Sequence, residues 1–329
     1  MPMIAVCIPT YNQSGYLAQS VESALRQTRA ATEIWISDDA STDSTLEIAK
    51  AICARTPMVK YIRQAKNLGM GGNPNWLLRQ PTSTFIAKLD SDDYYEPAYL
   101  EKLAALLERH PKAGYAHAAV REVDEYSVIK RSRLLGPRPE FVGAEDSLKA
   151  LVNGYRVAAN IILFRREALE AVNFWRADMA FADDWDLAVR LADAGWGNCH
   201  CSEVLANYRV WSDAGGYRSS RKLSEINGIR RVFEESLAPA FVKRGWDVGL
   251  LAKAKRRFAV AQSRTFFESR IDGLPRMELV EALNALGASP RLNVMIWISR
   301  HRSLSAPYLA YCRTKLKTKD IMKQFILRT

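Results

Sequence analysis

The sequence feature that could most directly do chemistry is a cluster of acidic side chains. Residues 87–97 read "AKLDSDDYYEP", so Asp90, Asp92, Asp93 and Glu96 fall within seven positions, directly behind an apolar run. Carboxylates this close repel one another, so their crowding needs a physical compensation. A solvated turn, a calcium loop, or a site for a metal ion and an anionic substrate could each supply it.

The calcium loop is excluded by the spacing. An EF-hand that started at Asp90 would need a glycine at its sixth position, and Tyr95 stands there. A solvated turn stays open, because Asp is common in turns. In the third alternative, Asp90-Ser91-Asp92 would hold Mg²⁺ or Mn²⁺, ions that bind to one or two carboxylates together with substrate phosphates. The cation would offset the charges of both the carboxylates and a diphosphate.

The elements around this cluster follow an alternating pattern. Apolar runs at 3–9, 33–39, 59–64 and 85–90 predict strands, and helical patterns follow them, the clearest at 97–111. Such alternation predicts an α/β protein with a mainly parallel sheet, in which ligands bind at the carboxyl ends of the strands. These runs end in "PTYN", "SDDAS" and "DSDD". No G-x-G-x-x-G follows the first strand and no Walker A lysine motif is present, which argues against dinucleotide and P-loop sites.

Charge is distributed unevenly along the 329 residues. The formal net charge is +11, and residues 218–329 hold 23 Lys and Arg against 9 Asp and Glu. This shift, together with "SDAGGYRSSRK", predicts a domain at 1–215 and a basic, mostly helical extension at 216–329. Five scattered cysteines indicate a reducing compartment, and neither a signal peptide nor a spanning apolar run is visible. We therefore expect a cytoplasmic protein, with a peripheral position at the inner face of the membrane as an open alternative.

Five motifs in order carry a resemblance to a known family. "IPTYN" at 8–12, "SDDASTD" at 37–43, "NLG" at 67–69, "AKLDSDD" at 87–93 and "FADDWDLAVRL" at 181–191 resemble the motif series of family-2 glycosyltransferases. These enzymes use nucleotide sugars, have the GT-A fold and mostly invert the anomeric configuration. The resemblance covers about residues 3–215. It implies a GT-A-like, Rossmann-related sheet flanked by helices, followed here by the α-helical C-terminal extension.

The resemblance also implies a nucleotide-sugar site at the strand ends. In the family, the first motif lies beside the base and an acidic residue of the second reads the base edge, here Asp39, with Asp38 as its neighbour. A carboxylate accepts the imide N–H of a pyrimidine, which favours a uridine or thymidine donor. Asp92 would be the direct metal ligand, and Asp90 would face the ribose or sugar and the metal. The nucleotide-sugar candidates are Pro9, Thr10, Tyr11, Asp38, Asp39, Asn67, Asn75, Asp90 and Ser91.

Transfer needs a base that takes the proton of the acceptor hydroxyl, while the metal stabilises the leaving nucleoside diphosphate. The family places this base in an acidic pair that opens a helix. By that resemblance Asp184 is the predicted base and Asp183 its supporting neighbour. On the residues alone, the pair could simply be acids favoured by a helix N-terminus.

The chain departs from the family pattern at two positions. Trp211 follows "YRV" where many relatives have a histidine near the metal, and Pro74 stands where an arginine is common. The second departure removes a cation expected beside the phosphates, for which Lys66, Lys88 or Arg209 could compensate.

The sequence thus predicts an inverting glycosyltransferase that uses Mn²⁺ or Mg²⁺ and a UDP- or dTDP-sugar. Its acceptor would be a glycan or a lipid-linked precursor in cell-surface polysaccharide synthesis. A sugar-nucleotide pyrophosphorylase and a non-catalytic, membrane-associated scaffold with a decayed GT-A site are the alternatives. Residues 314–329 place apolar side chains beside lysines, which suits an anionic membrane surface. The same helices could instead pack on the catalytic domain or form a homodimer contact. No motif for specific nucleic-acid binding is present.

Overall fold

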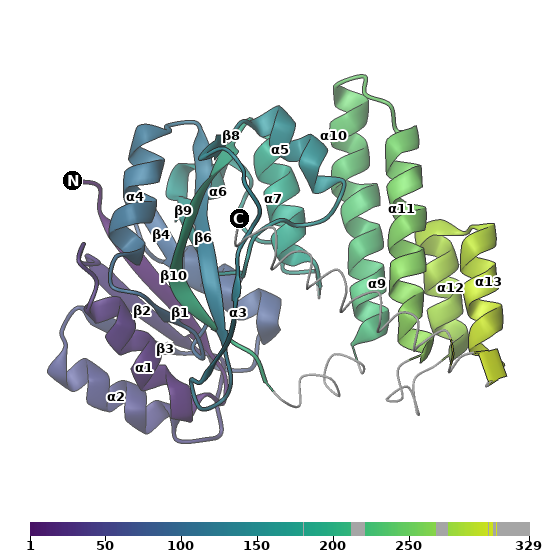
Figure 1. The fold of residues 1–329 in the computed structure, drawn as a ribbon. Helices are drawn as coiled ribbons and strands as arrows, with labels where there is room; N and C mark the ends of the chain where they lie inside the picture. The colour runs from purple at the N-terminus through teal and green to yellow at the C-terminus, as the bar shows by residue number, and fades with distance from the viewer. Residues whose placement is uncertain (180, 212–220, 268–275, 302, 305–306, 308–329) are drawn as a thin grey trace. The chain divides into compact units, whose positions relative to one another are not determined.

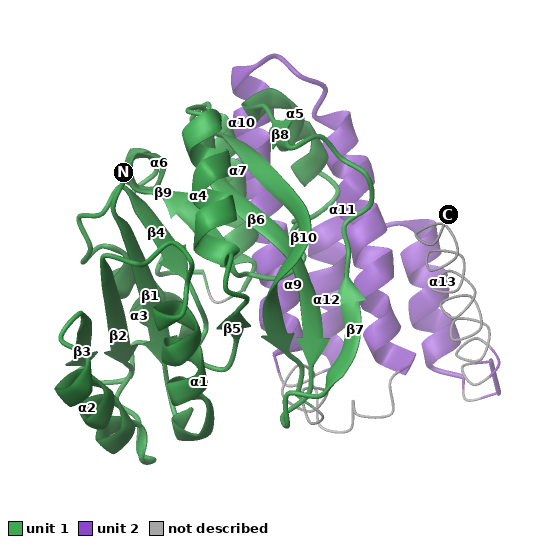
Figure 2. Cartoon of the chain, turned by 60° about the vertical axis from the view of Figure 1, so that its left-hand side comes forward, with its two compact units in different colours: residues 1–212 green, residues 213–329 purple. Residues whose placement is uncertain are grey.

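The structure is a computed structural model that describes residues 1–179, 181–211, 221–267, 276–301, 303–304 and 307. It divides into two compact units, Met1–Ser212 and Asp213–Thr329, which Figure 2 shows in separate colours. Each unit is described by itself. The assignment of 1–215 to a catalytic domain and of 216–329 to an extension stays a prediction.

The first unit alternates strands and helices (Figure 1). Its strands are β1 (Ile4–Thr10), β2 (Glu33–Asp38), β3 (Val59–Arg63), β4 (Phe85–Lys88), β5 (Tyr94–Tyr95), β6 (Ala113–Val123), β7 (Ile129–Arg133), β8 (Phe141–Val142), β9 (Ile162–Arg165) and β10 (Gly197–Arg209). Its helices are α1 (Ser14–Leu25), α2 (Thr45–Arg55), α3 (Gly69–Leu78), α4 (Tyr99–Arg109), α5 (Ala144–Leu151), α6 (Arg166–Ala171) and α7 (Asp183–Asp193).

The described strands form one sheet in the order β3-β2-β1-β4-β9-β6-β10-β5, with β7 paired to β6 and β8 to β10. Strands β3, β2, β1 and β4 are parallel, and the antiparallel β9 separates them from the parallel pair of β6 and β10. The sheet as a whole is therefore mixed, and parallel pairing holds within these two blocks. The α/β class predicted from the sequence is confirmed. Its parallel block brings the carboxyl ends of β1, β2 and β4 to one edge.

The core explains why the strands read as continuous apolar runs. Ile4, Val6 and Ile8 of β1 belong to a buried cluster with residues of α1, α2 and α4, while the alternate residues Ala5 and Cys7 are buried on the other face. Helices thus cover both faces of the strand (Figure 1), and both faces must be apolar.

The second unit is helical over its described residues, as the sequence predicted. Its α-helices are α9 (Lys222–Arg231), α10 (Ala238–Lys243), α11 (Gly249–Gln262), α12 (Arg276–Gly287) and α13 (Pro290–Ser299), with a π-helical turn at Val232–Leu237 and a 3₁₀ turn at Ser263–Phe267. Among the described residues, no helix is long and apolar enough to cross a bilayer. The segment 314–329, predicted to contact a membrane, lies outside the described residues.

Candidate functional site

The loops that leave β1 and β2 are bonded to each other at the edge of the parallel block. The amide of Asp39 donates to the carbonyl of Thr10 at 2.9 Å, and the amide of Asn12 donates to Oγ of Ser41 at 2.9 Å. Thr10 is buried and its Oγ1 has no partner, whereas Tyr11 is 47% exposed beside it. The first predicted motif therefore presents an unpartnered hydroxyl and an accessible aromatic ring.

The two acids that follow β2 have different partners. Asp38 is fully buried, and its carboxylate accepts from the Tyr61 hydroxyl at 2.6 Å, the Ser41 amide at 2.8 Å and Arg63 at 3.3 Å. Asp39 accepts from the amides of Leu68 at 2.6 Å and Gly69 at 2.9 Å. Asp38 therefore fixes its own loop, and Asp39 ties the end of β2 to the start of α3.

This tie depends on the backbone of Gly69, which has φ +79°, a conformation that side-chain-bearing residues rarely adopt. Asn67 supports the same turn, because its Oδ1 accepts from the Gly69 amide at 2.9 Å. A carboxylate has about four acceptor positions, so Asp39 keeps acceptor capacity beyond its two backbone bonds.

Among the asparagines of α3, sequence reasoning missed the one that is bonded to β2. Asn75, the predicted residue, is partly exposed, and its Oδ1 accepts from Arg79 of its own helix at 3.4 Å. Asn73 is buried, donates to the Ser37 carbonyl at 2.9 Å and accepts from the Ser37 hydroxyl at 2.5 Å. The stretch "GGNPN" offers two asparagines two positions apart, and no sequence signal separates them. Helical periodicity puts them on different faces.

The acidic turn after β4 is built around a buried lysine. Lys88, which is 5% exposed, donates to Oδ1 of Asp90 at 2.5 Å. Burial lowers the pKa of Lys88, but the charge and hydrogen bond of Asp90 outweigh it, so the pKa is raised overall, with further contributions from Asp183 and Asp93. Asp90 is therefore held by an ammonium group. Whether Lys88 also acts as the compensating cation beside the phosphates stays a prediction. Lys66, by contrast, is exposed.

Asp92 and Asp93 are carboxylates whose ionised forms are disfavoured. Burial, and then the charge of Asp90, raise the pKa of Asp92. Burial, and then the charges of Asp92 and Asp90, raise the pKa of Asp93 well above its usual range. One oxygen of Asp93 accepts from the Arg209 amide at 2.7 Å, and its other oxygen, Oδ2, has no partner. A cation at this turn would favour the ionised form of both carboxylates.

The end of β10 holds this turn in place. Arg209 is buried and donates to the backbone carbonyl of Asp92 at 2.8 Å and to that of Asp124 at 2.6 Å. Its guanidinium also lies 4.4 Å from the ring centroid of Tyr16. Arg209 is therefore a positioning residue for the acidic turn. The sequence named it only as a cation that could compensate for the missing arginine.

Trp211 has a definite place in this arrangement. Its indole Nε1 donates to Oδ2 of Asp92 at 2.9 Å, and its ring packs edge-on against Tyr16 at 5.1 Å between centroids. The residue at the family's histidine position therefore contacts the predicted metal ligand, as a hydrogen-bond donor rather than as a possible ligand.

Helix α7 brings the second acidic pair to the acidic turn. Asp183 and Asp184 form its first turn, and the charge of Lys88 acts on both carboxylates, although Lys88 lies some ninety residues earlier in the chain. Burial, and then the charge of Asp183, raise the pKa of Asp184 to about 7. Burial also raises the pKa of Asp183, which Lys88 lowers and Asp90 raises. A carboxylate with a pKa near 7 suits a general base at neutral pH.

Three residues next to the predicted site residues have strained backbone conformations. Asn12, Ala40 and Ala182 have positive φ angles of 51°, 62° and 59° although none is glycine. Asn12 directly follows Tyr11, Ala40 directly follows Asp39, and Ala182 directly precedes Asp183. Such conformations cost about 1–3 kcal/mol each and cluster at functional sites, which supports a site formed by these loops.

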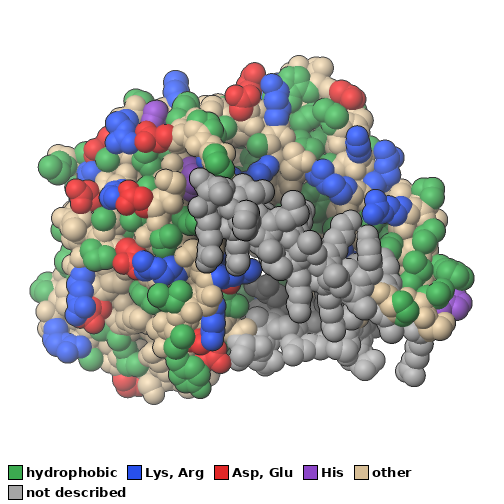
Figure 3. All heavy atoms as spheres, in the orientation of Figure 1, with side chains coloured by type: hydrophobic (Ala, Val, Ile, Leu, Met, Phe, Trp, Pro, Cys, Tyr) green, Lys and Arg blue, Asp and Glu red, His purple; other side chains and the backbone are tan. Residues whose placement is uncertain are grey.

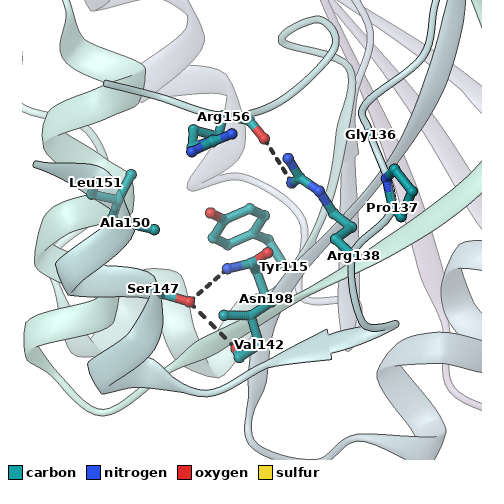
Figure 4. Close-up of a pocket in the computed structure, with 10 residues that line it drawn as sticks. All are labelled: Tyr115, Gly136, Pro137, Arg138, Val142, Ser147, Ala150, Leu151, Arg156 and Asn198. Atoms are coloured by element: carbon teal, nitrogen blue, oxygen red, sulfur yellow. Dashed lines mark hydrogen bonds between the residues drawn. The ribbon is translucent and has the colours of Figure 1, made fainter. Parts of the chain in front are cut away.

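A pocket of about 260 Å³ is lined by residues of β6, β8, α5 and β10 and of the segments at 136–138 and 156. Figure 4 shows Tyr115 in its middle, between Arg156 and Asn198, and Arg138 donating to the Arg156 carbonyl, at 3.1 Å. The charge of Asp184 contributes to the raised pKa of Tyr115, after burial and against the charge of Arg138. Trp185, next to Asp184, donates to the carbonyl of the pocket residue Leu151 at 3.0 Å. The predicted base is thus coupled to the pocket by both charge and packing.

The donor set fits a divalent cation that is held mainly by one carboxylate and by the ligand. Asp92 keeps one oxygen outside the bond to Trp211, and Asp93 has an orphaned oxygen directly beside it. Within the described part of the chain, no group of three or more His, Cys, Asp or Glu is arranged to hold a metal ion. Mg²⁺ and Mn²⁺ do not require such a cage when substrate phosphates complete their coordination.

The sheet, its flanking helices and the strand-end site define a GT-A glycosyltransferase. The profile of glycosyl transferase family 2 matches residues 5–172, about half of the chain. The putative glycosyltransferase EpsE of Bacillus subtilis is 31% identical over 221 residues, which cover 66% of this chain and 77% of that protein. The chain therefore belongs to glycosyltransferase family 2 and is a nucleotide-sugar-dependent enzyme, as the motif series predicted.

Other relatives and solved structures agree with this assignment. Chondroitin synthase of Escherichia coli is 28% identical over 195 residues, which cover 59% of this chain and 27% of that protein, so the chain spans about a quarter of that relative. The structure of S. aureus TarS 1–349 superimposes with a TM-score of 0.65 at 18% identity, covering 94% of this chain and 91% of that one. The mannosyltransferase PcManGT from Pyrobaculum calidifontis, in complex with GDP-Man and Mn²⁺, gives a TM-score of 0.56 at 17% identity over 96% and 87%. These two likenesses show the fold.

Proposed function

We propose that this enzyme transfers a sugar, with inversion, from a UDP- or dTDP-sugar to a hydroxyl of a glycan or lipid-linked acceptor in polysaccharide synthesis. The observation that supports the proposal most is electrostatic. The charge of Lys88, which is bonded to Asp90, also acts on the carboxylates of Asp183 and Asp184. Two acidic pairs from distant parts of the sequence thus share one site. Membership of the glycosyltransferase family favours this function over the pyrophosphorylase and scaffold alternatives.

The donor would lie across the ends of β1, β2 and β4. Tyr11 offers an exposed ring on which a base can pack, and Asp39 keeps acceptor capacity for a pyrimidine imide. Structures of TarS were obtained with UDP and with UDP-GlcNAc, which is in keeping with a uridine donor. Bound Mn²⁺ or Mg²⁺ would be held by Asp92, with Asp90 beside it, and would stabilise the charge of the leaving diphosphate.

Asp184 would remove the proton of the attacking hydroxyl. Its pKa of about 7 leaves a substantial ionised fraction at neutral pH and also makes it a stronger base than an ordinary carboxylate. Asp183 contributes by raising this pKa through its charge. Lys88 donates to Asp90 and would hold this carboxylate in position beside the donor.

The acceptor would enter through the pocket around Tyr115. Arg138 and Arg156 line this pocket, and no Asp or Glu is among its lining residues. An acceptor with a carboxylate or phosphate near the reacting hydroxyl would suit this charge. The hydroxyls and amides of Ser147, Asn198 and Tyr115 could bind sugar hydroxyls.

Thermal-shift measurements test the donor site. We expect UDP or dTDP to stabilise the wild type more with Mn²⁺ than without it, and Asp92→Ala to lose this Mn²⁺-dependent part. A variant that keeps the full Mn²⁺ effect would refute the assignment of Asp92. Asp146→Ala is a matched control, because Asp146 is an exposed acid in the first turn of another helix, α5.

A further inference from the structure

The second unit contains a pocket of about 390 Å³ whose charged lining is entirely basic. It is lined by Lys253, Arg256, Arg257, Val260, Ala261, Arg264, Ser289 and Arg291. Figure 3 shows Lys and Arg side chains gathered over α11 on one face of the molecule. We call these five cations and their surroundings the basic pocket.

Helical periodicity explains the first wall of the basic pocket. Positions 253, 256, 257, 260, 261 and 264 follow the i, i+3, i+4, i+7, i+8, i+11 pattern along α11 and the turn after it, so they share one face. Val260 and Ala261 are shorter than the arginines on either side. The face is therefore hollow in its middle and basic at its rim.

A close backbone approach supplies the second wall. A Cβ on Gly287 would lie 2.6 Å from the Arg256 amide nitrogen and 2.7 Å from the Arg256 Cα. These are backbone atoms that cannot move aside, so glycine is what allows the end of α12 to lie against α11. This approach brings Ser289 and Arg291, at the start of α13, to the basic face of α11.

The start of α13 adds positive potential to the five cations. Ser289 caps this helix, and its Oγ accepts from the Leu292 amide at 3.2 Å. The N-terminus of a helix carries a partial positive charge. Three sources of positive potential, the α11 face, Arg291 and the helix end, therefore converge on one pocket.

Some other cations of the same unit are paired with carboxylates. Lys255 lies on α11 beside the pocket residues and contacts Glu234 at 2.7 Å, and Arg230 contacts the same residue at 2.7 Å. Among the residues that the structure describes, the lining of the basic pocket includes no carboxylate. Like charges gathered in this way repel one another, and a bound anion would remove that cost.

We propose that the basic pocket binds a ligand with two or more phosphate groups. Four of its five cations are arginines, whose planar donor forks match phosphate oxygens in pairs. Five cations favour a ligand with several negative charges, and a single carboxylate supplies only one. The phosphates could belong to the headgroups of anionic phospholipids or to a soluble oligophosphate, and the experiment separates these sources.

The full-length chain is titrated with inorganic tripolyphosphate and, separately, with vesicles of phosphatidylcholine and phosphatidylglycerol in equal parts. EDTA is present throughout, to suppress metal-dependent binding at the acidic turn. Binding to tripolyphosphate identifies a soluble ligand, and binding to the vesicles alone identifies lipid headgroups. Binding to neither overturns the proposal.

A charge-matched pair of variants tests the location. Arg256→Ala with Arg291→Ala should weaken binding about tenfold or more, because two charge-assisted contacts are lost. Lys243→Ala with Arg300→Ala removes the same net charge outside the pocket, from residues that do not line it, and should change binding less than about threefold. Equal losses in the two variants would show that net charge alone is responsible and would overturn the proposal.

Gly287→Ala tests the shape of the pocket while leaving every charge in place. We expect it to weaken binding, because the side chain separates α12 from α11. Circular dichroism establishes that the variant is folded. Undiminished binding by the folded variant would overturn a built pocket, and if it does not fold, the charge-matched pair decides.

Discussion

The acidic turn of the first unit and the basic pocket of the second each gather like charges, but they differ in how far those charges are buried. At the acidic turn, Asp92 and Asp93 are partly or fully buried, and burial together with mutual repulsion raises the pKa of each. In the basic pocket all five cations are exposed, so water and salt screen their repulsion. The comparison teaches that burial acts together with crowding to disfavour the charged forms at the acidic turn, whereas solvent screens the crowded charges of the basic pocket.

The two regions also differ in how firmly they are built. At the acidic turn Asp90, Asp92 and Asp93 each have one carboxylate oxygen bonded to a partner, which is Lys88, Trp211 and the amide of Arg209 in turn. In the basic pocket the shape comes from a backbone approach at Gly287. We therefore expect substitutions at the acidic site to change chemistry and those at the basic pocket to change binding alone.

The largest expected effect is at the base. Asp184→Asn should lower kcat about 10²- to 10⁴-fold, because general base catalysis supplies a factor of that size. Steady-state transfer kinetics and calorimetric titration with the donor measure the two expected results, lost turnover and retained donor binding. Asp146→Asn is the control, and unchanged turnover of Asp184→Asn would exclude Asp184 as the base.

Removing the predicted metal ligand should have the next largest effect. Asp92→Ala should lower transfer about a hundredfold, because stabilisation of the leaving diphosphate is lost. The measurement is the dependence of the rate on the Mn²⁺ concentration, with Asp146→Ala as the control. A rate that stays saturable by Mn²⁺ at the wild-type concentration would place the metal on other residues.

The pH dependence follows from the raised pKa of Asp184, about 7. The ionised form is the active one, so kcat/KM should fall about tenfold for each pH unit below this pKa. The raised folded-state pKa also means that folding favours the protonated form, so this group destabilises the fold as the pH rises from about 4 to 7. Asp184→Asn should therefore raise Tm most above pH 7, and a Tm gain that is equal at pH 4 and pH 8 would contradict this account.

Ligand binding at the two charged regions should depend differently on salt concentration. Raising NaCl from about 50 to 300 mM shortens the screening length and should weaken phosphate binding at the exposed basic pocket about tenfold. Mn²⁺-dependent donor binding at the partly buried acidic turn should change by less than threefold. Titrations at both salt concentrations measure the two effects, and equal salt dependence would remove the distinction between the regions.

The smallest expected effect concerns Trp211. Trp211→Phe removes the hydrogen bond to Asp92 and should change the apparent Mn²⁺ affinity only a few-fold, because a single hydrogen bond contributes about 1 kcal/mol. Trp211→His offers a nitrogen that can bind the metal and should raise this affinity. Mn²⁺ titrations of the donor-dependent thermal shift compare the three proteins, and identical midpoints would show that Trp211 does not influence the metal.

The sequence by itself determined the fold class and most of the chemistry. Apolar runs that end in polar motifs predicted β1, β2, β3 and β4 and the edge at which their ends meet, because a strand buried on both faces has to be apolar along its whole length. The acidic pair Asp90 and Asp92 was predicted from residue type and spacing and Asp184 from the family resemblance, and in the structure the charge of Lys88 acts on both acidic segments. Their catalytic roles remain proposals.

Only the tertiary structure decided which neighbours each of these residues meets. It bonded Asn73 to the end of β2, made Arg209 and Trp211 partners of the acidic turn, and exposed Lys88 to the charges of both Asp90 and Asp183. It also formed the basic pocket from two segments joined by the approach at Gly287. The physical reason is that hydrogen bonds, burial and charge coupling depend on distances between residues far apart in the chain. Local patterns carry the type of a residue, and folding alone supplies those distances.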